Sequence, residues 1–166
     1  MRRLILMRHA KSSWEDQTVR DLDRPLAKRG RRGAALVGEW LARRGYRPDA
    51  ALVSTARRTQ ETWDRVVREA GAAPTRYLPE IYHAGAEQLL EVLRAAPDVE
   101  TVLLLGHQPG IGAFAQRLLA APFDDPRFVK YPSGATAVIE FEAAQWADVG
   151  WGSGRLTDFV EPKQFE

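Results

Sequence analysis

Short apolar runs alternate along the chain with longer segments in which apolar residues recur every three or four positions. The runs at 4–7, 50–53 and 101–105 predict buried strands. They are continuous rather than alternating, which is typical of strands covered on both faces of a sheet. Two later runs, at 136–141 and 155–160, predict a further hairpin-like pair of strands, separated by a loop rich in Gly and Trp.

Between these strands, helical periodicity predicts helices over 29–44 and around 63–70, 89–93 and 111–119. The Pro-rich stretch 122–132 is predicted to be a loop within the domain rather than a boundary. Strands alternating with helices indicate an α/β fold with a mostly parallel sheet. We therefore expect residues 1–166 to form a single domain, a three-layer α/β/α sandwich.

Charge changes this picture by separating the chain into two parts. Residues 1–70 contain 17 Lys and Arg against 9 Asp and Glu, whereas the remainder contains 7 against 13. A basic half suits an anionic substrate, although a solvated Arg-rich surface would have the same composition. No nucleic-acid-binding motif or interleaved aromatic stripe accompanies the charge, so no nucleic-acid partner is expected.

The remaining bulk features exclude several classes. The chain of 166 residues has no cysteine, which excludes disulfides and a Cys nucleophile. No apolar run is long enough to span a bilayer, so no membrane association is expected. The first apolar run is interrupted by Arg8 and His9, which argues against a signal peptide, and a cytoplasmic location is expected. These features leave the oligomeric state open.

Candidate chemistry follows the first three predicted strands. In open α/β sheets, ligands bind at the carboxyl ends of the strands. The residues at these positions are Arg8 and His9, then Ser54 and Arg58, then Gly106 and His107. Any one of these residues, taken alone, is more often structural than functional. Because the predicted strands are parallel neighbours, we expect two arginines and two histidines to meet at one edge of the sheet.

These residue types suit a phosphoryl group. Arginine presents a planar fork of donors that matches phosphate oxygens, and helix N-termini add backbone N–H groups. A neutral imidazole is a capable nucleophile at neutral pH. The pattern therefore indicates phosphoryl transfer.

Other chemistries receive less support. A zinc site built from His9, His83 and His107 lacks the closely spaced ligand pair that such sites use. The chain has no P-loop motif for nucleotide binding. A non-catalytic module that binds phosphoproteins remains an alternative, but loss of His9 or Arg58 would be expected there, and both are present.

The order and spacing of four elements resemble the histidine phosphatase superfamily, which includes phosphoglycerate mutases and acid phosphatases. Arg8-His9-Ala10 resembles the family's Arg-His-Gly motif with Ala replacing Gly, and Pro25-Leu26 with Gly30 resembles its helix entry. Ser54, Arg58 and Thr62 match the family's Ser-x-x-x-Arg-x-x-x-Thr spacing, and Gly106-His107 matches its second histidine. The resemblance implies a phosphoglycerate mutase-like fold.

Within the superfamily, the chain's small size and the run from Arg8 to Trp14 are most similar to SixA-type phosphohistidine phosphatases. That resemblance implies that His9 attacks phosphorus, that Arg8, Arg58, His107 and Ser12 hold the phosphate, and that no metal or other cofactor is required. The implied substrate is phosphohistidine on a signalling protein. The runner-up is a small phosphomonoester.

The resemblance also suggests Glu80 as general acid, although a solvated loop carboxylate is an equal alternative. An ester's alkoxide leaving group needs a proton, whereas the imidazole of phosphohistidine leaves more readily. Glu15 occupies a position where sugar-phosphate members often have Asn, and a carboxylate there argues against a phosphoglycerate mutase.

Overall fold

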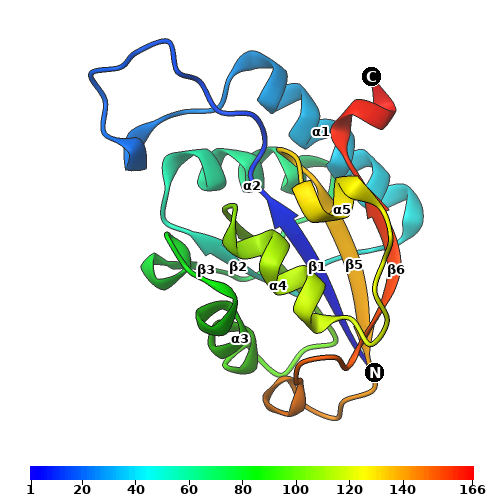
Figure 1. Ribbon diagram of the computed structural model, residues 1–166. Helices are drawn as coiled ribbons and strands as arrows, with labels where there is room; N and C mark the ends of the chain where they lie inside the picture. The colour runs from blue at the N-terminus through cyan, green and yellow to red at the C-terminus, as the bar shows by residue number, and fades with distance from the viewer.

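A six-stranded sheet forms the centre of the protein, whose computed structural model describes residues 1–166 (Figure 1). Its strands are β1 (Arg2–Arg8), β2 (Ala50–Ser54), β3 (Thr75–Leu78), β4 (Thr101–Gly106), β5 (Thr136–Phe141) and β6 (Gly154–Val160). Their order across the sheet is β3-β2-β4-β1-β5-β6. The four strands from β3 to β1 are parallel, and β5 runs antiparallel to both β1 and β6. The predicted mostly parallel sheet and the late antiparallel pair are therefore confirmed.

Helices cover both faces of the sheet, as the apolar strands predict (Figure 1). The helices are α1 (Lys28–Arg44), α2 (Arg57–Ala70), α3 (Ala86–Arg94), α4 (Gly110–Leu118) and α5 (Pro126–Lys130). Side chains of α1 and α2 pack in one apolar cluster, and those of α3, α4 and α5 pack in the other. This arrangement confirms the three-layer α/β/α sandwich.

Strand β1 shows why continuous apolar runs serve such a sheet. Successive side chains of a strand point to opposite faces. Leu4 and Leu6 belong to the cluster beneath α3 and α4, whereas Ile5 and Met7 belong to the cluster beneath α1 and α2. All four side chains are fully buried. A single polar residue in this run would therefore be buried on one face or the other.

The structure corrects the sequence-based assignment in two places. Residues 75–78, which carried no strand prediction, form the edge strand β3, where Arg76 and Tyr77 are exposed. Within the predicted loop 122–132, residues 126–130 form the short helix α5, whose N-cap Asp125 accepts a hydrogen bond from the backbone N–H of Arg127. Both elements are short and largely exposed, so apolar periodicity does not reveal them.

None of the helices combines the length and the apolar character that crossing a bilayer requires.

Candidate functional site

The carboxyl ends of three neighbouring strands bring the predicted residues together. Strands β2, β4 and β1 are adjacent, and Arg8 pairs in register with Gly106. His9 and His107 therefore leave neighbouring strands at the same level, and their ring centroids lie 5.3 Å apart. Arg58 enters from the first turn of α2, directly after β2. The structure thus places both histidines and Arg58 at one edge of the sheet.

The loop that follows His9 is packed tightly against the start of α1. A Cβ added at Gly30 would lie 2.0 Å from the carbonyl oxygen of Lys11, so only glycine permits this close approach. The backbone N–H of Ala10 donates to Thr62 Oγ1 at 3.1 Å, and Gly134 N–H donates to the His9 carbonyl at 2.9 Å. The segment after β1 is therefore fixed from several directions.

His9 is buried and has a defined orientation. Its Nδ1 lies 2.7 Å from the carbonyl oxygen of Ala10, and since a carbonyl can only accept, Nδ1 carries the ring proton. The Nε2 atom makes no hydrogen bond within the protein and keeps its lone pair. Burial, together with the charges of Arg8, Arg58 and Arg24, lowers the pKa of His9 to about 3, despite the opposing effect of the Ala10 carbonyl. His9 is therefore neutral at pH 7, with Nε2 available as a nucleophile.

His107 is oriented by the residue that ends β2. Its Nε2 lies 2.8 Å from Ser54 Oγ, and its Nδ1 is buried without a partner. Burial and the nearby His9 and Arg58 lower the pKa of His107 to about 3. Buried polar atoms are normally hydrogen-bonded, so the unpartnered Nδ1 marks a place where a ligand atom would be accommodated.

Arginine side chains surround His9. Arg58 is almost entirely buried, and Arg8 donates through Nη1 to the carbonyl oxygen of Tyr131 at 3.1 Å. The Nε atoms of Arg8 and Arg58 are buried without partners. Sequence reasoning did not single out Arg24, a third arginine, although it directly precedes the Pro25-Leu26 element. Its charge contributes to the low pKa of His9, and it is also buried.

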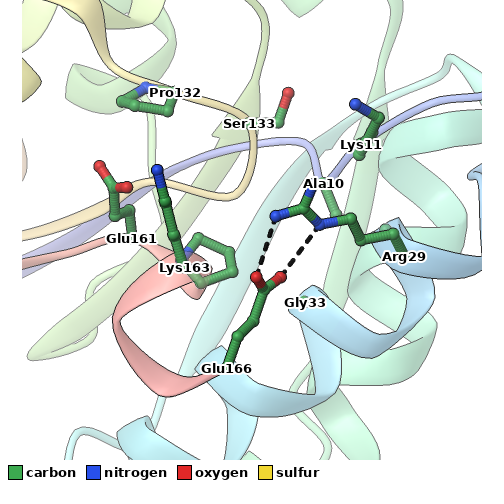
Figure 2. A pocket seen from close by; sticks show the side chains of 11 residues that line it. Ala10, Lys11, Arg29, Gly33, Pro132, Ser133, Glu161, Lys163 and Glu166 are labelled. Carbon is green, nitrogen blue, oxygen red and sulfur yellow. Dashed lines mark hydrogen bonds and ion pairs between the residues drawn. The ribbon is translucent and has the colours of Figure 1, made fainter.

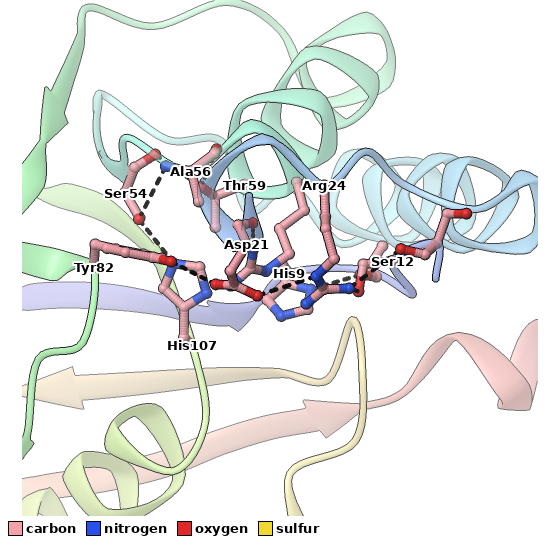
Figure 3. A network of polar contacts seen from close by, with 12 residues as sticks. His9, Ser12, Asp21, Arg24, Ser54, Ala56, Thr59, Tyr82 and His107 are labelled. Atoms are coloured by element: carbon pink, nitrogen blue, oxygen red, sulfur yellow. Dashed lines mark hydrogen bonds and ion pairs between the residues drawn. The ribbon is translucent and has the colours of Figure 1, made fainter. Parts of the chain in front are cut away.

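Asp21 links Arg58 and Arg24 in the polar network (Figure 3). Asp21 was not predicted from the sequence. It begins the short 3-10 helix η1 (Asp21–Asp23), and its carboxylate accepts from Arg58 Nη2 at 3.0 Å and from Arg24 Nε at 3.1 Å. Arg58 Nη1 also donates to the Asp21 carbonyl at 2.6 Å, and the Tyr82 hydroxyl donates to the carboxylate. No local sequence signal marks Asp21, because its partners lie up to 61 positions away.

The pKa of Asp21 shows how strongly it is held. Burial alone would raise this pKa, but the hydrogen bonds from Tyr82, Arg24 and Arg58 outweigh that effect and lower it. Asp21 is consequently ionised at neutral pH. It can orient the arginines but cannot supply a proton.

The other predicted residues lie at different distances from this cluster. Ser12 Oγ accepts from Arg24 Nη1 at 2.6 Å and thus belongs to the polar network. Glu80 lies in the 3-10 helix η2 (Pro79–Ile81), is exposed, and contributes to a shallow hollow with Tyr82 and His83. It makes no hydrogen bond with the histidines or arginines, and its role as an acid stays a prediction. The structure has no group of three His, Asp or Glu side chains arranged to hold a metal ion.

Two hollows flank the cluster. One, of about 340 Å³, includes Arg58, Tyr82 and His107 among its lining residues. The other, of about 190 Å³, lies beside Ala10 and Lys11 and is closed on one side by the Arg29–Glu166 ion pair (Figure 2). Neither histidine of the cluster lines the second hollow, whereas His107 and Arg58 line the first.

Known proteins share this sequence and architecture. The model of the histidine phosphatase superfamily (branch 1) matches residues 4–83. An uncharacterized protein of Mycobacterium tuberculosis (strain ATCC 25618 / H37Rv) is 37% identical over 163 residues, which cover 95% of this chain and 100% of the relative.

Two solved structures, each described as a "putative phosphohistidine phosphatase SixA", are similar over nearly their whole length. The protein from Nakamurella multipartitia has a TM-score of 0.82 at 33% identity, covering 97% of this chain and 96% of its own. The protein from Agrobacterium tumefaciens has a TM-score of 0.80 at 30% identity, covering 97% and 98% respectively. From the motifs, the fold and these relatives together, the chain belongs to the histidine phosphatase superfamily.

Proposed function

We propose that the protein is a metal-independent phosphatase that removes the phosphoryl group from phosphohistidine on a protein, by way of a phosphorylated His9. The observation that carries this proposal is the environment of His9. The imidazole is neutral, its Nδ1 proton is held by the Ala10 carbonyl, its Nε2 has no hydrogen-bond partner, and the charges of Arg8, Arg58 and Arg24 act on it. The two solved relatives at 30% identity or more, each described as a "putative phosphohistidine phosphatase SixA", support the substrate class.

In the first step, His9 Nε2 attacks phosphorus, the new Nε2–P bond forms, and the P–N bond of the substrate breaks. The electron pair of that bond remains on the departing imidazole, which takes up a proton from solvent water. In the second step, a water oxygen attacks phosphorus, the Nε2–P bond breaks, and inorganic phosphate leaves with neutral His9 restored.

The surrounding residues position the phosphoryl group and stabilise its charge. Arg8, Arg58 and Arg24 provide the donors for the phosphoryl oxygens, and their positive charges suit the phosphoryl transition state. If the Ser54 hydroxyl donates to Nε2 of His107, then Nδ1 of His107 carries a proton and becomes a further donor. Asp21 holds Arg58 and Arg24 in place, and Ser12 holds Arg24 from the other side.

The lack of a buried acid near His9 supports the proposed substrate class. The ionised Asp21 cannot protonate a leaving group, and Glu80 is exposed outside the polar network. An alkoxide leaving group would need such an acid, whereas an imidazole is a better leaving group. Phosphohistidine therefore fits this site better than a phosphomonoester.

The test compares EDTA-treated protein on a phosphohistidine-bearing protein and on p-nitrophenyl phosphate. We expect rapid loss of phosphohistidine, slower ester hydrolysis, and a ³²P label on the protein that is absent in His9→Ala. Glu80→Gln should spare phosphohistidine hydrolysis. Activity on the ester alone would move the substrate to small phosphomonoesters, and absence of EDTA-resistant turnover on both would contradict the proposed mechanism.

A further inference from the structure

Trp14 is the most exposed large aromatic side chain of the protein and lies beside the catalytic cluster. It is 67% exposed, whereas Trp40, Trp63 and Trp146 are all buried. Its indole ring covers the guanidinium of Arg24, whose central carbon lies 3.5 Å from the ring centroid. Because Arg24 also binds Asp21 and Ser12, Trp14 forms part of the rim around His9. One surface of the indole is used to cover Arg24, and the rest faces solvent.

The base of the loop that carries Trp14 is anchored. Ser12 pairs with Leu26 in an isolated β-bridge, and Ser13 N–H donates to the Pro25 carbonyl at 2.8 Å. One residue further, Ala27 N–H donates to the Lys11 carbonyl at 2.9 Å. The backbone hydrogen bonds just before Trp14 therefore restrict where its side chain can lie. A partner that binds Trp14 would lose less conformational entropy than if the loop were free.

A basic groove begins next to Trp14. Ser13 and Glu15, the neighbours of Trp14 in the chain, line it together with residues from the starts of α1 and α2 and from the outer side of α2. Its cationic residues are Lys28, Arg31, Arg57, Arg65 and Arg68, and its carboxylates are Glu15, Glu61 and Asp64. Arg57 is paired with Glu61 at 2.8 Å, which leaves four cations against two carboxylates.

We propose that Trp14 and this basic groove form the docking surface for the protein substrate, namely an acidic segment that presents an apolar side chain next to its phosphohistidine. The apolar side chain would pack on the exposed part of the Trp14 indole, and the acidic residues would lie along the groove. Charge complementarity of this kind mainly accelerates association and sets specificity. The inference rests on the proposed function, since it names the protein that this site would recognise.

The test uses two synthetic peptides phosphorylated on histidine, identical in length and with Leu on both sides of the phosphohistidine. One has outer glutamates and the other outer lysines. We expect kcat/KM for the acidic peptide to exceed that for the basic peptide about tenfold at low salt, and the preference to shrink as ionic strength rises. Equal hydrolysis of both peptides would overturn the docking surface and leave the proposed function intact. Hydrolysis of neither peptide would overturn the proposed function itself.

Variants separate the two parts of the surface. Lys28→Glu/Arg68→Glu should abolish the preference for the acidic peptide, while Arg43→Glu/Arg76→Glu, which makes the same charge change at exposed sites outside the groove, should retain it. Loss of the preference for the acidic peptide in the first double variant alone supports docking in the groove. An equal loss of this preference in both double variants contradicts it.

Trp14→Ala should lower kcat/KM for the peptides about tenfold more than it lowers kcat/KM for p-nitrophenyl phosphate. The matched control is Trp151→Ala, which removes a second tryptophan stacked on an arginine, 4.0 Å from Arg117 and outside the site. This control should change neither activity. An equal loss on both substrates in Trp14→Ala would show that Trp14 only holds Arg24, and would contradict its contact with the substrate.

Discussion

Two regions on either side of the segment 9–11 combine arginines with carboxylates, and they differ in burial. In the cluster around His9, the Arg58 side chain is 6% exposed and pairs with Asp21, whose side chain is 46% exposed. In the hollow beside Lys11, Arg29 is 59% exposed and pairs with Glu166 through two hydrogen bonds of 3.1 and 2.9 Å (Figure 2). A buried guanidinium interacts more strongly with the charges around it than an exposed one. Burial of the arginine, rather than residue type, thus distinguishes the candidate site from the surface ion pair.

Burial also changes the protonation of the two histidines in the cluster. Charged imidazolium is disfavoured in a dry environment surrounded by arginines, and the pKa of both His9 and His107 is lowered to about 3. The hollow beside Lys11 contains no histidine, and two carboxylates, Glu161 and Glu166, stand against its three basic residues. Substitutions in the two regions should therefore differ in magnitude and in what they change.

The largest expected effect is that of Arg58→Ala. In the proposed mechanism Arg58 is a buried donor to the transferring phosphoryl group, so its loss should reduce kcat/KM by about 100- to 1,000-fold. Steady-state kinetics on a phosphohistidine substrate, with a thermal melt to verify folding, measures this. A loss of less than about threefold would remove Arg58 from the catalytic cluster.

The pH dependence of stability should be large as well. Between about pH 6.5 and 3, the unfolded chain binds protons at His9 and His107 that the folded chain does not, so the free energy of unfolding falls as the pH falls. Each histidine contributes a slope of up to about 1.4 kcal/mol per pH unit. Urea unfolding from pH 4.5 to 7 should therefore show a shallower slope in His107→Gln than in the native protein. An unchanged slope would contradict the burial of a neutral His107.

Asp21→Asn should have an intermediate effect. The substitution keeps the shape but weakens two charge-assisted hydrogen bonds that orient Arg58 and Arg24, and we expect kcat to fall about tenfold. Asp21 acts by orienting arginines that would bind free phosphate. A high phosphate concentration should therefore stabilise the variant against unfolding less than it stabilises the native protein. Glu166→Gln makes the same chemical change in the exposed pair and serves as the control. Equal losses in the two variants would refute the positioning role.

The smallest effect should come from Arg29→Ala. An exposed ion pair contributes about 0–1 kcal/mol to the free energy of unfolding, and Arg29 lies outside the cluster that holds His9. Urea unfolding should detect a change within that range, and phosphohistidine hydrolysis should be unaffected. A loss of activity comparable with that of Arg58→Ala would erase the distinction between the two regions.

Sequence reasoning recovered the parts of the fold whose signal is local. Continuous apolar runs located β1, β2 and β4, and helical periodicity located α1 to α4. The edge strand β3 and the short helix α5 escaped because each has few buried residues and therefore little periodicity. At the site, residues next to strand ends were accessible to prediction, since the carboxyl ends of adjacent parallel strands must lie together.

The sequence alone thus determined the central strands, the burial of both sheet faces, and the placement of His9, Arg58 and His107 at one edge. The apolar runs define the strands, and these three residues follow the carboxyl ends of those runs. Only the tertiary structure decided that Asp21, Arg24 and Tyr82 join them. Tyr82 and Arg58 reach Asp21 across separations of 61 and 37 residues, through loops and turns that no periodic pattern governs. Tertiary structure also decided the charge state of the histidines, because burial and neighbouring charges are properties of the packed chain and not of any segment.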